Sequence, residues 1–190
     1  MGKNELLDAI KLGLNRVTQT MKNHKGVDFI MKSRLKFEKW FQVELLKELL
    51  IITEDIESIR LINEYPVSEK KSKKGETIDL AILGENGKIA AIELKVVPTN
   101  YDVPGFKKST KAITDAINEM IGDLAKSRSE GFQCCFSIGL VFPFPLDPDH
   151  RNNRTDFVKQ ESKLKEVGQV ELLPCKISDG YSSWYYILHI

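Results

Sequence analysis

The feature that most constrains this chain is a pair of largely apolar runs separated by a short turn. The runs cover residues 78–83 and 89–97, and the turn between them is Gly84-Glu85-Asn86-Gly87. Apolar runs of strand length on both sides of a Gly- and Asn-containing turn predict a β-hairpin. Alternate residues of a strand face opposite ways, and here both sets are mostly apolar. The hairpin is therefore expected at the centre of a sheet that is covered on both faces.

Three charged side chains interrupt these runs: Asp79 in the first, and Glu93 and Lys95 in the second. Residues two apart on a strand share a face, so Glu93 and Lys95 point the same way. The same alternation predicts Ile78, Leu80 and Ile82 on the opposite face. Burying a charge among apolar groups is costly unless the charge is paired or binds a metal. The three residues are candidate functional residues; the alternative is a structural ion pair.

The length of the loop decides whether Asp79 joins the other two. We expect a three-residue loop over residues 85–87, in which the glycine closes the turn in the left-handed conformation. A two-residue loop would shift the pairing by one residue and break the convergence of the charges. The expected register gives the pairs Gly84–Lys88, Ala81–Ala91 and Asp79–Glu93.

A fourth candidate lies on a helix predicted for residues 33–53. Phe37, Trp40, Phe41 and Leu45 follow the spacing i, i+3, i+4 and i+8 of one helix face, and Glu44 falls at i+7 inside this stripe. A carboxylate within an apolar stripe needs a partner. We expect Glu44 to meet the hairpin acids, unless the stripe is wider and leaves Glu44 at its edge.

The remaining pattern predicts a mixed α/β fold, with one central β-sheet flanked by helices. A single domain over residues 1–190 is expected, because no linker or internal repeat divides the chain. Further strands are predicted at residues 59–67, 134–142, 169–177 and 184–190. Further helices are predicted at residues 4–23 with Asn4 as N-cap, from Ser109 or Thr110 to about 128, and from Asn153 or Thr155 to about 167.

Composition limits the cellular setting. No apolar run reaches the roughly 20 residues that span a bilayer, and the N-terminus does not resemble a secretory signal, so no membrane partner is expected. Cys134, Cys135 and Cys175 lack the spacing of a disulfide framework or a zinc site. Free, buried thiols in a reducing cytoplasm are the simplest interpretation.

Charge gives one further indication. The formal net charge is only +1, so no global basic field is expected. A local run of lysines precedes the hairpin and is either a solvated loop or an edge that contacts phosphates. The run consists of Lys70, Lys71, Lys73 and Lys74.

These residues, taken in order, resemble the PD-(D/E)xK nuclease superfamily, which has the fold of restriction endonucleases and Holliday-junction resolvases. Thr77-Ile78-Asp79-Leu80 is similar to the strand with the metal-binding Asp, and Ile92-Glu93-Leu94-Lys95 to the E-x-K half. Glu44 is similar to the additional acid of many members. The core would cover about residues 33–142, with the N-terminal helix and the C-terminal helix and hairpin as additions.

Two departures accompany the resemblance. No proline precedes Asp79. The helix after the hairpin lacks the Gln-x-x-x-Tyr pattern of some members and carries Asp115, Asn118, Glu119 and Asp123 instead.

The resemblance implies a Mg²⁺-dependent endonuclease in which Mn²⁺ can substitute, acting on DNA in restriction or in repair and recombination. Asp79, Glu93 and the Leu94 carbonyl would hold the ion, and Glu44 a second ion or its water. Lys95 would lie near the attacking water. A homodimer is compatible with this activity, because cutting a duplex needs two sites. The alternative is a catalytically inactive nucleic-acid-binding or assembly module on the same fold.

Overall fold

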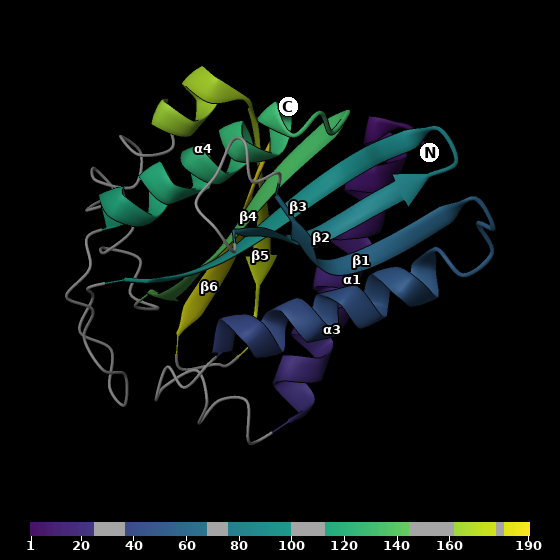
Figure 1. Ribbon diagram of the computed structural model, residues 1–190. Helices are drawn as coiled ribbons and strands as arrows, with labels where there is room; N and C mark the ends of the chain where they lie inside the picture. Colours follow the sequence, from purple (N-terminus) through teal and green to yellow (C-terminus); the bar gives the residue numbers. More distant parts are fainter. Residues whose placement is uncertain (25–36, 68–75, 100–112, 145–161, 178–180) are drawn as a thin grey trace.

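The molecule is built on one six-stranded mixed sheet, with the strand order β1-β2-β3-β4-β6-β5. The computed structural model describes residues 1–24, 37–67, 76–99, 113–144, 162–177 and 181–190 (Figure 1). The strands are β1 (Ile59–Pro66), β2 (Thr77–Gly84), β3 (Gly87–Pro98), β4 (Cys134–Phe144), β5 (Gln169–Cys175) and β6 (Ser182–His189). The helices are α1 (Lys3–Asn23), α3 (Phe37–Ile52) and α4 (Ile113–Ser129), and residues 162–167 are also helical.

The connections confirm the predicted mixed α/β class. Strands β1, β2 and β3 form an antiparallel meander. The chain then crosses over through α4, so that β4 pairs with β3 in parallel. Strand β6 is antiparallel to β4, and β5 is antiparallel to β6 at the sheet edge, which makes the predicted C-terminal hairpin.

Helices cover both faces of the sheet, as the two-sided apolar pattern predicts (Figure 1). On one face, Ile92 and Leu94 of β3 pack in the same core cluster as Phe41 of α3 and several residues of α1. On the other face, Ala91 packs in a second cluster with residues of α4. Strand β3 therefore contributes alternate residues to two separate cores, and its charged residues must lie next to one of them.

The α1 helix begins earlier than predicted. Gly2 is its N-cap, and the Gly2 N–H donates to the Glu5 carboxylate at 2.6 Å. Asn4, the predicted cap, lies within the first turn instead. The apolar stripe of α1 is buried as predicted, because its members recur on one helix face. It includes Leu6, Ile10, Leu14, Val17 and Met21.

The three cysteines are free and buried, as predicted. Cys175 lies with Thr18 and Tyr185 in a polar cluster inside the core. The Thr18 hydroxyl is 3.1 Å from the Tyr185 hydroxyl and 3.4 Å from the Cys175 sulfur. Burial raises the pKa of the Cys175 thiol to about 11, so this thiol stays protonated at neutral pH.

The turn between β2 and β3 differs from the prediction. It has two loop residues, Glu85 and Asn86, with Gly84 opposite Gly87 and Leu83 opposite Lys88. An irregularity then shifts the register by one residue between Ile82 and Leu83. Beyond it the pairs are Ile82–Ala90, Ala81–Ala91 and Leu80–Ile92. The predicted loop is wrong, but the bulge restores the predicted Ala81–Ala91 pair.

Some predictions fall outside the described residues. They are the lysine run Lys70, Lys71, Lys73 and Lys74, the caps at Ser109 or Thr110, and the helix start at Asn153 or Thr155. Within the part of the chain that the structure describes, no helix has both the length and the hydropathy that crossing a bilayer requires.

His189 provides a test of the core by pH. Its side chain is buried on β6, and within the described residues neither ring nitrogen has a hydrogen-bond partner. Burial lowers the pKa of His189, an effect that Lys3 reinforces. A lowered folded-state pKa means that the unfolded chain takes up the proton first. The contribution of His189 to stability is therefore full above pH 6.5, the ordinary pKa for His, and falls as the pH drops below it.

We expect the wild type to lose more free energy of unfolding than His189→Phe as the pH falls below 6.5, by up to about 1.4 kcal/mol per pH unit. The comparison with the variant is needed because the raised pKa of Glu93 acts in the opposite direction over the same pH range. Urea titrations between pH 8 and pH 5 measure the slope. His189→Phe should lower it, whereas the exposed His24→Asn should leave it unchanged. Equal slopes in the wild type and His189→Phe would contradict this account.

Candidate functional site

Asp79 lies where β2 and β3 separate. Their pairing ends at Leu80 and Ile92, and Asp79 is the next residue on β2. Its carboxylate oxygen Oδ2 accepts a hydrogen bond of 2.8 Å from the Leu94 N–H. A side chain thus takes the place that a backbone carbonyl would occupy in a continued ladder. Because backbone N–H groups point along the sheet, the Asp79 carboxylate lies in the gap between the strands.

The alternation of β2 breaks at this same residue. Ile78 packs with Ala81 in the core beneath α4, whereas Leu80 packs in the core beneath α1 and α3. Strict alternation predicts Ile78 and Leu80 on one face, so that prediction is wrong for Ile78. On β1, Glu64 lies between the residues that pair with the two neighbours of Asp79, and it has a φ of 53°. The irregular backbone on both strands lets Asp79 turn toward β3.

Helix α3 fixes the Asp79 backbone from one face of the sheet. Gln42 is buried, and its Nε2 donates to the Asp79 carbonyl and to Asn63 Oδ1, both at 2.9 Å. The Gln42 Oε1 accepts from Lys39 at 3.0 Å, and Lys39 also pairs with Glu64 at 2.6 Å. This network joins α3, β1 and β2 around Asp79, and it holds the place at which the strands separate.

Glu93 lies on the face that α4 covers, and only 2% of it is exposed. Its Oε1 is 2.7 Å from Lys126 Nζ of α4. Burial raises the pKa of the Glu93 carboxyl to about 8; the Lys126 ammonium group opposes this rise, and the charges of Asp123 and Asp79 add to it. The Lys126 ammonium group therefore favours the charged form of this carboxyl group, but it offsets the effect of burial only in part.

Lys95 shares the face of Glu93, as the two-residue spacing predicts. Its Nζ is 3.2 Å from Asp123 Oδ2, and the other oxygen of Asp123 is 3.4 Å from Lys126. Burial alone would lower the pKa of Lys95, but Asp123, together with Glu38 and Glu119, raises it above the ordinary value. Charges of opposite sign thus alternate along Glu93, Lys126, Asp123 and Lys95. We call these four residues and Asp79 the charged cluster.

Helix α4 can bring its charged side chains this close because it packs tightly on β4. At Gly139, a Cβ atom would lie only 2.8 Å from the sulfur of Met120. Met120, Ile117 and Leu124 form the buried stripe of α4. Asp123 and Lys126 lie beside this stripe and reach over the sheet to β3.

The structure does not bring Glu44 to the charged cluster. The Glu44 carboxylate pairs with Lys47 of its own helix at 2.9 Å, and Lys47 is also 3.7 Å from Glu48. Glu48 in turn is 3.6 Å from Arg16 of α1, so this acid lies toward α1. Glu44 thus shares Lys47 with the acid that lies toward α1.

Glu38 takes the place predicted for Glu44. Its Oε2 accepts a hydrogen bond of 3.0 Å from the Val96 N–H of β3, and its charge acts on Lys95. Glu38 and Glu44 are six positions apart, which places the two side chains about 120° apart around the helix. The prediction that Glu44 meets the hairpin acids is therefore wrong, and Glu38 of the same helix contacts β3 instead.

Sequence reasoning missed Glu38 and Lys126 and assigned no role to Asp123. A signal was present for the two α4 residues: a helix that connects two parallel strands must pack on the sheet they share. Polar residues beside its apolar stripe then face any charged residue of β3. Asp123 and Lys126 stand three apart, which puts them on the same side of α4.

Two observations bear on whether the side chains of the charged cluster can bind a metal ion. Within the described residues, no three His, Cys, Asp or Glu side chains are grouped so that they could hold a metal. However, Glu93 Oε1 and Asp123 Oδ2 are buried, and neither accepts a hydrogen bond of good geometry, although each lies within ion-pair distance of a lysine. Such oxygens suit a hard cation. In this structure the Lys126 ammonium group supplies the positive charge next to Glu93 and Asp123.

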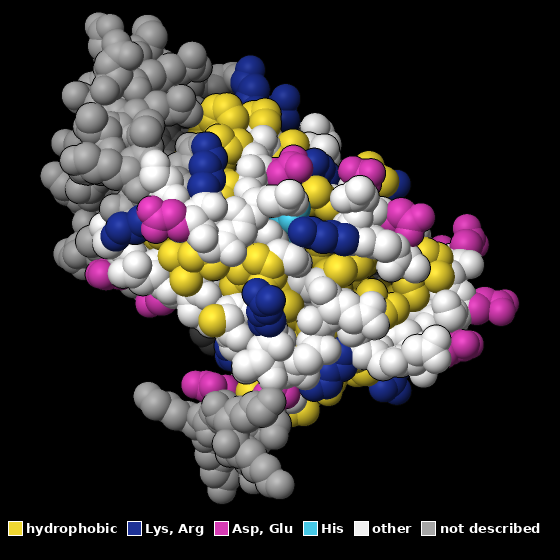
Figure 2. Space-filling model, turned by 90° about the horizontal axis from the view of Figure 1, so that it is seen from above, with side chains coloured by type: hydrophobic (Ala, Val, Ile, Leu, Met, Phe, Trp, Pro, Cys, Tyr) yellow, Lys and Arg dark blue, Asp and Glu magenta, His cyan; other side chains and the backbone are white. Residues whose placement is uncertain are grey.

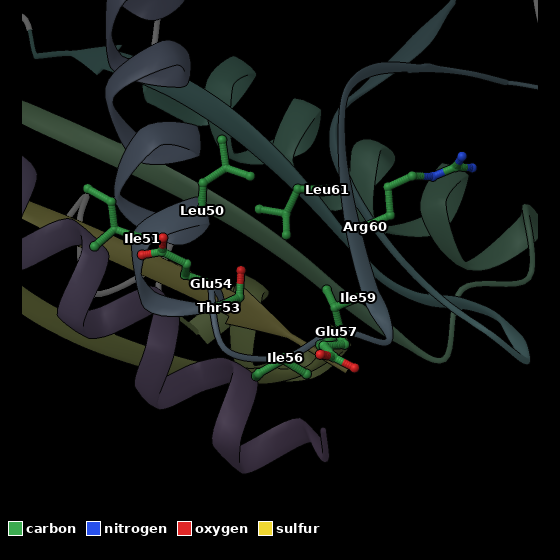
Figure 3. Close-up of a pocket in the computed structure, with 9 residues that line it drawn as sticks. All are labelled: Leu50, Ile51, Thr53, Glu54, Ile56, Glu57, Ile59, Arg60 and Leu61. Atoms are coloured by element: carbon green, nitrogen blue, oxygen red, sulfur yellow. The ribbon is translucent and has the colours of Figure 1, made fainter.

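A separate surface hollow contains none of these residues. It lies between the C-terminal end of α3 and β1, and Figure 3 shows apolar side chains such as Leu50, Ile51 and Leu61 around it. The charged side chains Glu54, Glu57 and Arg60 also line it. On the face shown in Figure 2, basic and acidic side chains are interspersed, in agreement with a net charge of +1.

Comparison of the chain with protein-family models, with curated proteins and with solved structures gave no match. The interpretation of the charged cluster therefore depends on its own geometry and chemistry.

The network around Asp79 leads to a stability prediction. Gln42→Leu removes both donors of the Gln42 amide and leaves the Asp79 carbonyl and Asn63 without them. We expect a loss of about 1–3 kcal/mol in the free energy of unfolding, the usual cost of unsatisfied buried groups. Urea denaturation measures it, with the exposed Gln19→Leu on α1 as control. A loss no greater than that of the control would mean that Gln42 does not hold Asp79.

Proposed function

We propose that this protein is a divalent-metal-dependent nuclease that hydrolyses phosphodiester bonds, with DNA as its substrate. The observation that supports the proposal is that the Asp79 carboxylate accepts the N–H of Leu94, the residue between Glu93 and Lys95, where β2 and β3 separate. Two carboxylates and a lysine at one opening of a sheet form a donor set for a hard cation beside a fixed positive charge.

The topology supports the same proposal. Helix α3, the strands β1 to β3, helix α4 and strand β4 follow one another in the order expected for the PD-(D/E)xK superfamily, and β3 and β4 are parallel. The two candidate motifs lie on β2 and β3, as that resemblance requires. Membership of the superfamily is part of the proposal.

In this proposal, Asp79, Glu93 and the Leu94 carbonyl hold Mg²⁺ or Mn²⁺. A bound ion of this kind stabilises charge on phosphoryl oxygens and lowers the pKa of a water molecule. The Asp79–Leu94 hydrogen bond orients the carboxylate toward β3 before any ion arrives. Lys95 places its ammonium group next to the attacking water, and Asp123 holds that group in position.

The additional acid is then Glu38. Its contact with Val96 puts its carboxylate next to the segment that carries Lys95, whereas Glu44 is paired with Lys47. The resemblance gives Glu44 the role of binding a second ion or orienting its water, and we assign that role to Glu38. The lysine run Lys70, Lys71, Lys73 and Lys74 remains the predicted contact with the nucleic-acid backbone.

A second candidate function is a nucleic-acid-binding or assembly module without turnover. The observation that favours it is the Lys126 ammonium group, which lies 2.7 Å from the carboxylate that would bind the metal. Both functions suit the cytoplasm, where the three free thiols would remain reduced. A homodimer that cuts both strands of a duplex belongs to the first proposal.

Plasmid cleavage in Mg²⁺ or Mn²⁺ tests the nuclease. We expect Asp79→Asn and Lys95→Ala each to reduce the cleavage rate by at least about 100-fold, the scale of losing a group that transfers protons or stabilises charge. Asp115→Asn, on the exposed surface of α4, is the matched control and should cleave like the wild type.

The same assay separates Glu38 from Glu44. Glu38→Gln should slow cleavage, and Glu44→Gln should not. Equal cleavage by the wild type, Asp79→Asn and Lys95→Ala would reject the nuclease. A wild type that retards an oligonucleotide in a gel and cuts nothing would favour the module without turnover.

A further inference from the structure

The Lys126 ammonium group occupies a position that resembles that of a bound cation. Three oxygens surround it: Glu93 Oε1 at 2.7 Å, the Thr77 carbonyl at 3.1 Å and Asp123 Oδ1 at 3.4 Å. They come from β3, β2 and α4, so the ammonium group joins the two strands that carry the candidate ligands to the helix above them. Its side chain is only 22% exposed.

This position conflicts with a metal on the same carboxylate. Glu93 is buried, and its Oε1 is the atom nearest to the ammonium group. A divalent ion on that oxygen would lie within a few ångströms of a positive charge, in a site with little water to screen the repulsion. Like charges about 4 Å apart repel by several kcal/mol even at an effective dielectric constant of about 20. The two cations therefore exclude each other.

We propose that Lys126 is the resident counter-ion of Glu93, and that a divalent cation binds there only by displacing the Lys126 ammonium group. This inference rests on the proposed function, because it takes Glu93 as a metal ligand. Lys126 then sets the metal concentration at which the site fills, and it stabilises the buried carboxylate when no metal is bound.

The displaced ammonium group has a second partner. Asp123 stands one turn before Lys126 on α4, and its Oδ1 is already 3.4 Å away. The ammonium group can move toward Asp123 without losing its only counter-ion. Displacement therefore exchanges one cation on Glu93 for another and expels no lysine into an apolar environment.

Lys88 and Glu130 provide a matched comparison. Lys88 Nζ lies 3.4 Å from a Glu130 oxygen, and the Glu130 side chain is 4% exposed. The exposed fraction of the Lys88 side chain is 29%, close to the 22% of Lys126. Here the same glutamate also supplies its backbone carbonyl, at 2.7 Å. This pair holds the end of the α4 segment to β3, and neither residue belongs to the charged cluster. Loss of the Lys88 ammonium group should not change metal binding.

The test measures Mn²⁺ affinity by titration calorimetry, without nucleic acid, for the wild type, Lys126→Met and Lys88→Met. We expect Lys126→Met to bind Mn²⁺ at least about tenfold more tightly than the wild type, and Lys88→Met to bind as the wild type does. Adding Asp79→Asn to Lys126→Met should remove the gain. Circular dichroism establishes that each variant is folded.

A second measurement uses the wild type alone, and it holds even if Lys126→Met does not fold. The lysine side-chain ammonium signals are followed by NMR during a Mg²⁺ titration. The Lys126 signal should shift as the site fills, and the Lys88 signal should not.

The outcomes separate this inference from the proposed function. Wild-type cleavage together with unchanged or weaker Mn²⁺ binding by Lys126→Met would overturn the inference and leave the nuclease standing. Tighter binding by Lys126→Met in a protein that cleaves nothing would support the inference and reject the nuclease. Absence of Mn²⁺ binding in both proteins would overturn the inference, and the cleavage assay would then decide the nuclease by itself.

Discussion

The burial of the Glu93 carboxylate is the constraint on which the rest of the site depends. With 2% of the residue exposed, its charge cannot be solvated by water and must be balanced from within the protein. The nearest cation belongs to α4, the helix that crosses over from β3 to β4. The raised pKa of Glu93 is a consequence of that burial, and the charges alternate along the inner side of the helix that covers it.

Asp79 is positioned next to β3 by the backbone and not by an ion pair. It leaves the regular alternation of β2, and its carboxylate accepts the Leu94 N–H where the ladder ends. Gln42 of α3 holds its carbonyl from the other face of the sheet. The helices on the two faces therefore act on different residues: α3 holds the backbone of Asp79, and α4 supplies a cation to Glu93. Both residues lie near the end of the pairing between β2 and β3.

Particular elements show how far sequence reasoning reached. The hairpin, the two covered faces and the buried stripes of α1 and α4 follow from periodicity, and the structure agrees. The turn of the hairpin does not: its loop has two residues, and a bulge beyond it recovers the Ala81–Ala91 pair. Glu44 was chosen because it interrupts an apolar stripe, but the stripe of α3 serves both the sheet and α1. Its flank therefore accommodates an acid that pairs with Lys47.

By itself, the sequence determined the elements, their order and the side of β3 on which Glu93 and Lys95 lie, because these depend on spacings of a few residues. Only the tertiary structure decided that Lys126 and Asp123 face those residues, that Glu38 reaches β3, and that Asp79 turns into the gap. These contacts join residues more than ten positions apart, and they depend on the distance and rotation at which a helix settles on a sheet. Such packing is set by the whole core, through contacts like that of Met120 at Gly139, and no local pattern encodes it.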